Sequence, residues 1–304
     1  MELWAIITFG SAFFQNLRST LQKHLKGRMG TTGATFVRFG YGVPFAVLYL
    51  CVLHYGFSRP LPVPNGTFAI WAVIGAMTQI AATFLLVHIF SFRNFAVGTA
   101  YSRTEPAQAA ILALLLFGEK VTVAVVSAIA ISVVGVMLIS VARSAVSPRT
   151  LVTSVASPTA RFGLLSGLFF GMSAISYRQA SLALVPSLPA PDAVMQASYT
   201  LVIVIVMQTV VMSAYMLWRD RAEMARTLKA YRIGLLVGFV GATASFGWFT
   251  AMTLQQAAIV KALAQVEILF TFASAILFFK ERVNLLEMMG CLLIVGGILA
   301  LLLL

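Results

Sequence analysis

Two glutamates deep within long apolar stretches are the residues of this sequence best able to do chemistry. Glu105 lies about 12 residues before the end of the stretch 94–117, about 18 Å from a membrane surface at a helical rise of about 1.5 Å. Glu267 lies at a matching depth in the stretch 257–279. Exposing a carboxylate to lipid costs about 2.5 to 3.5 kcal/mol on insertion scales, so each must face a cavity or a partner. Each could titrate protons, bind substrate or only tie helices together.

Other polar side chains surround both glutamates at helical spacing. The residues expected on the same helix face are Tyr101 and Gln108 for Glu105, and Thr271 and Ser274 for Glu267. A second stripe, at i and i+4, pairs Thr99 with Arg103 and Lys261 with Gln265. Helices that are polar on more than one face are expected to be enclosed by protein around a cavity.

Five cationic residues also lie within the apolar stretches, namely Arg18, Arg38, Arg103, Arg178 and Lys261. Arg18 and Arg178 occupy matching depths, whereas Arg38 and Lys261 could also reach the interface by extending their long side chains. Against two acids, five cations leave an excess of three positive charges. A cavity with that balance favours a solute that carries a carboxylate or a phosphate.

The glycines and prolines within the apolar stretches point first to helix packing and helix kinks. Gly163, Gly167 and Gly171 recur every four residues and predict close packing of two helices. Pro44 and Pro106 fall inside predicted helices, where proline kinks the chain. Because proline is common in membrane helices, a gating role for Pro106 and a purely structural one both stay open.

The composition excludes several classes of protein. Of the 304 residues, 60% are hydrophobic and 10% charged, against roughly 25% charged in soluble domains. With a mean hydropathy of +0.95, the chain cannot be a soluble enzyme, a disordered protein or a nucleic-acid-binding domain. Cys51 and Cys291 both lie in apolar stretches and suggest neither a disulfide nor a metal site. Since no catalytic motif is present, we expect no enzyme and no cofactor.

The elements that position these residues are ten predicted membrane helices, each with about 20 mostly apolar residues. They cover residues 3–25, 33–55, 67–90, 94–117, 121–142, 161–185, 192–217, 232–254, 257–279 and 284–304.

An internal repeat organises these helices. A shift of 162 residues aligns the segment Gly118 to Thr122 with Lys280 to Asn284, and Glu105 with Glu267. We therefore expect five-helix repeats at residues 1–143 and 161–304, joined by a linker at 144–160. Because five is odd, the second repeat enters the membrane from the opposite side. The predicted fold is an all-α integral membrane protein with ten transmembrane helices in two inverted repeats, which is a transporter architecture.

The segments from Thr99 through Pro106 and from Leu114 through Thr122 resemble the signature of the drug/metabolite transporter superfamily. More narrowly, they resemble its ten-helix EamA-like branch. The second copy, Glu267 through Asn284 and on to Gly296-Gly297, is similar to the same signature but has Ile268 where the first has Pro106. The resemblance implies a secondary transporter that works by alternating access, often an exporter of amino acids, other metabolites or toxic compounds.

The predicted function is export of a small polar or amphipathic metabolite, such as an amino acid or organic anion, around a midplane cavity. The alternatives are proton-coupled efflux of organic cations or drugs and, more remotely, a lipid-modifying membrane enzyme or a channel. The expected partners are a small-molecule substrate, protons and membrane lipid, without nucleic acid, and a monomer is compatible with the pattern. The expected location is the bacterial inner membrane.

Loop charges predict the orientation of the chain. The odd-numbered loops and the helix ends beside them hold fourteen Lys and Arg residues, whereas the even-numbered loops hold only Arg59 and Lys120. Cytoplasmic loops collect basic residues, so the odd loops should be cytoplasmic and both termini extracytoplasmic. The family resemblance implies the opposite orientation, with both termini in the cytoplasm.

This orientation is tested by two reporters fused after Leu304. Because moving the basic run Arg219 to Arg232 outward opposes the charge bias, an alkaline phosphatase fusion should be active and a fluorescent-protein fusion dark. A bright fluorescent fusion with an inactive phosphatase would establish the opposite orientation.

Overall fold

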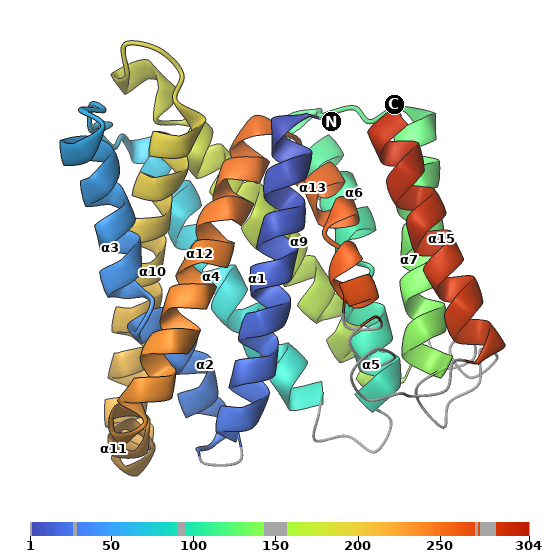
Figure 1. The fold of residues 1–304 in the computed structure, drawn as a ribbon, viewed down its shortest axis with the longest axis horizontal. Coiled ribbons are helices and arrows are strands. Elements are labelled where there is room, and N and C mark those ends of the chain that lie inside the picture. The colour runs from blue at the N-terminus through green and yellow to red at the C-terminus, as the bar shows by residue number, and fades with distance from the viewer. Residues whose placement is uncertain are drawn as a thin grey trace. The chain divides into compact units, whose positions relative to one another are not determined.

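The computed structural model describes residues 2–26, 29–89, 95–142, 157–270, 273 and 284–303, and its regular elements in these ranges are all helices (Figure 1). The α-helices are α1 Leu3–Lys26, α2 Thr31–Gly40, α3 Val43–Cys51, α4 Gly66–Ile89, α5 Phe95–Ser102, α6 Glu105–Phe117, α7 Val123–Ala142, α9 Pro158–Leu182, α10 Ala193–Arg219, α11 Arg221–Lys229, α12 Tyr231–Leu254, α13 Ala257–Leu263 and α15 Leu285–Leu303. A π-helical turn, Val52–Gly56, extends α3, and a 3-10 turn covers Val185–Ser187.

Among the described residues, six helical stretches are long and apolar enough to cross a membrane. They are Thr32–Gly56, Gly66–Leu86, Val123–Ser140, Ala193–Arg219, Tyr231–Leu254 and Leu285–Leu303. The all-helical membrane fold expected from the sequence is confirmed.

Three of the predicted membrane helices are interrupted within their length. The stretch 33–55 breaks between α2 and α3 at Tyr41-Gly42, and the stretch 94–117 breaks between α5 and α6 at Arg103-Thr104. The stretch 257–279 breaks at Ala264-Gln265, after which residues 266–270 are helical again. Residues 271–272 and 274–279 of that stretch lie outside the described residues.

Proline explains the first two interruptions. Pro44 and Pro106 are each the second residue of the half-helix that follows the break. A proline has no N–H to donate, and its ring clashes with the carbonyl four residues earlier. Around the second break the backbone tightens, since the Thr104 N–H donates to the Tyr101 carbonyl at 3.1 Å.

The third interruption forms without proline. The N–H of Gln265 donates to the Ala262 carbonyl at 3.2 Å, and the N–H of Glu267 donates to Ala264 at 3.0 Å. These bonds span three residues instead of four and form one tight turn. A shift of 162 residues aligns Arg103, which lies in the break of the first copy, with Gln265, which lies in this break. Both copies are therefore interrupted at matching positions.

The chain forms two compact units that do not coincide with its two halves. Unit 1 comprises Met1–Ala5, Thr78–Ile175 and Gln255–Leu304, and unit 2 comprises Ile6–Met77 and Ser176–Leu254. Each unit therefore combines helices from both halves. Helices α1, α4 and α9 each have residues in both units.

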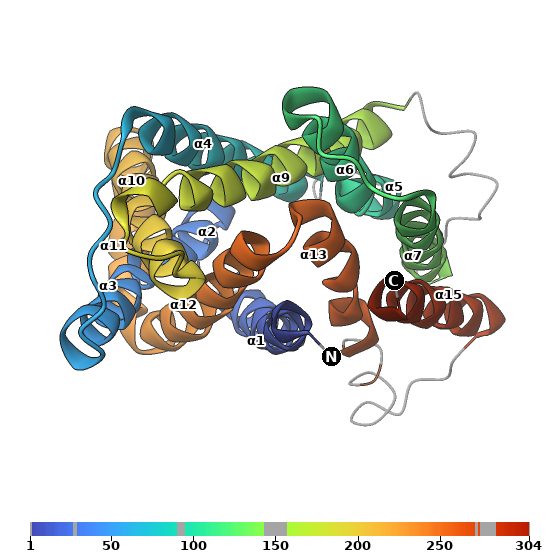
Figure 2. The same ribbon diagram turned by 90° about the horizontal axis from the view of Figure 1, so that it is seen from above.

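Glycines bring the helices of unit 1 into close contact. Helices α7 and α15 lie side by side in Figure 1 and again in Figure 2. A Cβ atom on Gly135 would lie 2.6 Å from the Gly290 carbonyl oxygen, and one on Gly290 would lie 2.7 Å from that of Gly135. Backbones at such short range gain dispersion contacts that larger side chains would prevent.

The Gly163, Gly167 and Gly171 stripe of α9 packs against α5 and α6. A Cβ atom on Gly163 would overlap the Gly98 carbonyl oxygen, and one on Gly167 would lie 3.0 Å from the Ser102 carbonyl oxygen. One on Gly171 would lie 3.2 Å from the Ala109 backbone nitrogen. The stripe therefore lets α9 lie directly against the interrupted helix α5–α6.

Unit 2 joins its polar groups through hydrogen bonds between helices. The Tyr177 hydroxyl donates to the Gly75 carbonyl at 2.9 Å and accepts from Gln208 Nε2 at 3.1 Å. Gln196 Nε2 donates to the Ser181 carbonyl at 2.8 Å. With no water in the hydrocarbon region, such internal bonds are needed to satisfy buried polar groups.

The glycine stripe can be tested by adding one methyl group. Gly163→Ala should lower the melting temperature of the purified protein by several degrees, because the new methyl meets backbone, and overpacking costs about 1–3 kcal/mol. The matched control is Gly10→Ala, since a Cβ at Gly10 meets nothing within 4 Å. The control should melt at or slightly above the wild-type temperature. Equal melting of the two variants would contradict the close packing of α9.

Candidate functional site

An ion pair joins the two interrupted helices of unit 1. Lys261 Nζ lies 2.8 Å from Glu105 Oε1, and each side chain is about one-fifth exposed. Glu105 lies in the first turn of α6 and Lys261 in the last turn of α13. The helix dipole stabilises an anion at the former position and a cation at the latter. Pairing and dipoles together offset the cost of placing two charges at membrane depth.

The ion pair connects the two sequence repeats asymmetrically. The 162-residue shift places Thr99 at the position of Lys261, and Glu267 at that of Glu105. The symmetry-related pair would therefore be Thr99 with Glu267, which cannot be ionic. The lysine that pairs with Glu105 is therefore present in the second repeat alone.

Gln265 lies in the second break and is 5% exposed. Neither its side-chain oxygen nor its side-chain nitrogen has a hydrogen-bond partner among the described residues. Burying an amide without partners is costly, and such groups occur where a ligand or water completes the bonding. Glu267, two residues later, is 9% exposed. The second break thus contains a buried carboxyl and a buried amide close together in sequence.

A cavity of about 400 Å³ adjoins the first break. One wall carries Tyr101, Thr104 and Gln108, and the other carries the α9 leucines Leu164, Leu165 and Leu168. Gln108 Nε2 donates to Thr104 Oγ1 at 2.6 Å, and Thr104 Oγ1 donates to the Tyr101 carbonyl at 2.7 Å. Because Thr104 and Gln108 are engaged in these bonds, the surface of the cavity is mainly apolar and suits an apolar group.

The interruption divides the polar stripe that the sequence predicts around Glu105. Tyr101 and Gln108 line the cavity with α9, whereas Glu105 pairs with Lys261 of α13. Arg103 lies within the break itself and is half-buried. Thr271, expected beside Glu267, lies outside the described residues.

Arg18 and Arg178 belong to unit 2, apart from the glutamates of unit 1. Arg178 Nη1 donates to the carbonyls of Met252 at 2.7 Å and Thr253 at 3.3 Å, in the last turn of α12. The last carbonyls of a helix have no partner within it, so Arg178 has a clear structural role.

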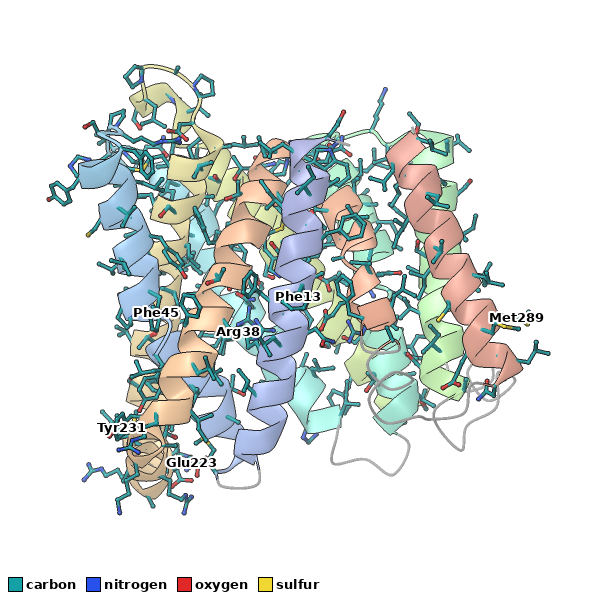
Figure 3. All side chains as sticks on the ribbon, viewed as in Figure 1. Phe13, Arg38, Phe45, Glu223, Tyr231 and Met289 are labelled. Atoms are coloured by element: carbon teal, nitrogen blue, oxygen red, sulfur yellow. The ribbon has the colours of Figure 1, made fainter. Side chains whose placement is uncertain are left out.

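Arg18, 7% exposed, and Arg38 converge on Gly241 of α12. A Cβ atom on Gly241 would lie 3.2 Å from Arg18 Cδ and 3.9 Å from Arg38 Cγ. Figure 3 shows Arg38 about midway along the helices of unit 2. The sequence of unit 2 contains only three acids, Asp192, Asp220 and Glu223, all at helix ends. The cationic excess of the membrane region therefore lies in unit 2.

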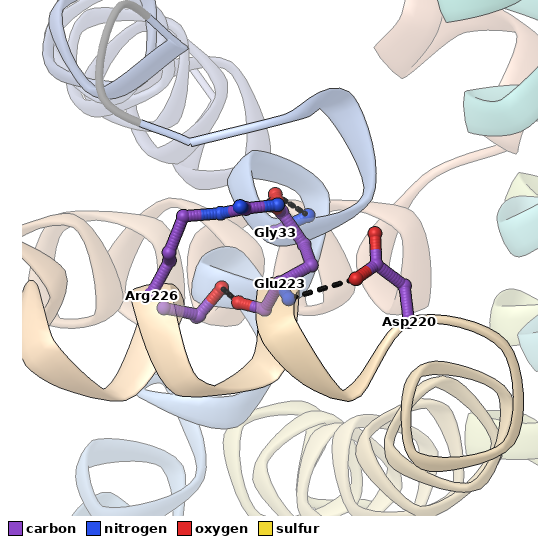
Figure 4. A network of polar contacts seen from close by, with 5 residues as sticks. Gly33, Asp220, Glu223 and Arg226 are labelled. Atoms are coloured by element: carbon purple, nitrogen blue, oxygen red, sulfur yellow. Dashed lines mark hydrogen bonds and ion pairs between the residues drawn. The ribbon is translucent and has the colours of Figure 1, made fainter.

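Glu223 was missed by the sequence interpretation, which treated Arg219 to Arg232 as a loop. The segment contains α11, and Asp220 Oδ1 accepts from the Glu223 N–H at 2.9 Å at its start. Glu223 is 2% exposed and accepts from the Gly33 N–H at 3.2 Å (Figure 4). The spacing Asp220-x-x-Glu223 is a helix-start signal that could have revealed α11.

Comparison with known proteins decides the family. The model of the EamA-like transporter family matches residues 2–141 and 158–303. The chain belongs to the EamA-like transporter family. It is therefore a membrane transporter of the drug/metabolite superfamily, embedded in the bilayer and acting on a small molecule.

A solved structure described only as "Crystal structure of protein" is similar in fold to this EamA-like transporter. Its TM-score is 0.73 at 15% sequence identity, over 99% of this chain and 96% of that chain. No curated protein matches the chain. The family and the fold are thus established.

The Glu105–Lys261 ion pair is tested by a double-mutant cycle on thermal stability. Glu105→Gln or Lys261→Gln alone should lower the melting temperature markedly, because removing one partner of a buried pair costs about 3–5 kcal/mol. The double variant should melt well above the value expected from adding the two losses. Arg161→Gln, at an exposed position, is the control and should have little effect. Strictly additive losses would contradict the pairing.

Proposed function

We propose that this chain is a secondary active transporter that exports a small polar or amphipathic metabolite by alternating access. The observation that carries the proposal is the pair of interrupted helices joined by Glu105 and Lys261. Discontinuous helices at membrane depth supply substrate and ion sites in transporters, because their half-helix ends offer polar groups to a solute. We place the transporter in the bacterial inner membrane with both termini extracytoplasmic, and the proposal includes no enzymatic step.

The substrate class follows from the charges at the two breaks. A zwitterion such as an amino acid carries both charges of the ion pair, so its carboxylate can bind Lys261 while its ammonium binds Glu105. This exchange replaces one internal ion pair by two intermolecular ones and leaves no charge unpaired. A simple anion offers no group that could replace Lys261 as the partner of Glu105. We therefore favour the zwitterion as substrate, with organic anions next.

The cavity beside the first break offers a separate contact for an apolar group. It is formed with α9, whereas the Glu105–Lys261 pair is formed with α13. Thr104 and Gln108 already form hydrogen bonds within their own helix, so the cavity surface is mainly apolar. A volume of about 400 Å³ is within the range for small-molecule sites.

Alternating access needs parts of the chain that move as bodies. The two compact units are better candidates for these bodies than the sequence halves, because each unit packs helices from both halves.

A second function, proton-coupled efflux of organic cations, is supported by Glu267. It is a 9% exposed carboxyl group at the second break, where a cation and a proton could compete for the same oxygen atoms. In that case Glu105 would remain paired with Lys261, and Glu267 would exchange the proton.

Ligand stabilisation of the purified protein separates these two functions. If the proposal holds, amino acids should raise the melting temperature by mass action. At 100 times Kd, binding adds about 2.7 kcal/mol to the free energy of unfolding. The methyl ester, which lacks the carboxylate, and the N-acetyl derivative, which lacks the ammonium, should stabilise far less. Stabilisation by cationic drugs but not by amino acids would overturn the proposal in favour of the second function.

Transport by single variants tests the residue roles. In proteoliposomes, Glu105→Gln should abolish or uncouple transport, because the exchange of ion pairs needs both charges. Glu267→Gln should also impair transport, whereas the exposed control Arg161→Gln should transport like wild type. Normal transport by both glutamate variants would leave the two carboxyl groups with a helix-tying role only.

A further inference from the structure

Helix α11 lies across one end of two membrane spans in unit 2. It connects α10 and α12 directly, and Figure 1 shows it at their lower end with its axis crossing theirs. Glu223, Met224 and Thr227 face inward and are at most 8% exposed. The remaining positions of α11 are exposed. The helix therefore has the placement and the two-sided character of an interfacial helix.

Both acidic groups of this segment have hydrogen-bond partners, Glu223 on the buried side and Asp220 at the exposed start of the helix. Asp220 accepts the Glu223 N–H at the start of the helix, and the Glu223 carboxylate bonds to Arg226 at 2.6 Å and to the Gly33 N–H at 3.2 Å (Figure 4). The Tyr41 hydroxyl also donates to the Thr227 carbonyl at 3.2 Å. These bonds fix α11 against both ends of α2, so the helix presents one defined outer face.

The outer face is basic and is flanked by aromatic residues. Its exposed cations are Arg219, Arg221, Arg226, Lys229 and Arg232. Trp218, 79% exposed, ends the α10 span, and Tyr231, 50% exposed, begins the α12 span. Arg219 lies over the Trp218 ring at 5.6 Å, and Arg232 lies over the Tyr231 ring at 5.9 Å. Trp and Tyr at the ends of spans mark the level of the lipid headgroups.

We propose that the outer face of α11 binds anionic phospholipid headgroups. The aromatic residues hold the helix at the depth of the phosphates, where arginine can form paired hydrogen bonds to phosphate oxygens. The nearest concentrated source of negative charge is then the bilayer that surrounds α10 and α12. Because α11 also contacts α2 through Glu223, bound lipid stabilises this end of unit 2. The proposal does not depend on the identity of the transported solute.

The experiment compares melting temperatures of the full-length protein in vesicles. Wild type should melt several degrees higher in mixed phosphatidylcholine and phosphatidylglycerol than in phosphatidylcholine alone. Arg221→Gln/Lys229→Gln should lose most of this rise, while its melting in phosphatidylcholine shows whether it is folded. The matched control, Lys120→Gln/Arg161→Gln, removes two exposed cations elsewhere and should keep the rise.

Two further measurements use only the wild-type protein. Added salt should reduce the phosphatidylglycerol-specific rise, because exposed charges are screened within about 10 Å at 0.1 M ionic strength. Soluble glycerol phosphate should not reproduce the rise, since it is not concentrated at the aromatic level. The proposal is overturned if the α11 variant keeps the full rise, if the control loses as much, or if glycerol phosphate acts equally well.

Discussion

The ion pair between Glu105 and Lys261 is the interaction around which unit 1 is organised. Interrupting a helix within a bilayer frees backbone groups that water cannot satisfy, and a single charge there is costly. Here the interruptions bring an acid at a helix start within 2.8 Å of a cation at a helix end. Each charge stabilises the other, and both complement the dipoles of their half-helices. The breaks can persist because their charges are paired.

In unit 2, hydrogen bonds between helices satisfy polar groups that water cannot reach within the bilayer. Arg178 donates to the last carbonyls of α12, and Tyr177 bonds to Gly75 and Gln208. Arg178 thus completes the bonding of backbone carbonyls, and Tyr177 joins α9 to α4 and α10. In unit 1, the Glu105–Lys261 ion pair can be exchanged for a ligand's charges. This exchangeable pair supports placing solute recognition at the breaks of unit 1.

The sequence predicts the features that follow from local chemistry. Apolar length predicts the spans, Pro44 and Pro106 predict kinks in two of them, and the repeat matches Glu105 with Glu267. The break at Ala264-Gln265 has no proline to reveal it. The partner of Lys261 was also unpredictable, because a lysine in a membrane helix can extend to the interface as readily as it can pair.

Tertiary packing accounts for the other differences between expectation and structure. Glu223 was hidden in a basic segment that was taken for a loop, and its contact with Gly33 joins residues 190 positions apart. The compact units mix helices from both repeats, which no spacing within a single repeat reveals. The start signal Asp220-x-x-Glu223 was the one local indication of α11.

Hydrogen–deuterium exchange tests the central claim, that the two breaks form a water-accessible polar site within the membrane span. Amides in a continuous helix surrounded by apolar neighbours exchange very slowly, because opening exposes unpaired groups to lipid. The account predicts that peptides covering Arg103-Thr104 and Ala264-Gln265 exchange much faster than peptides from α7 and α15. Exchange at the breaks as slow as in α7 and α15 would contradict it.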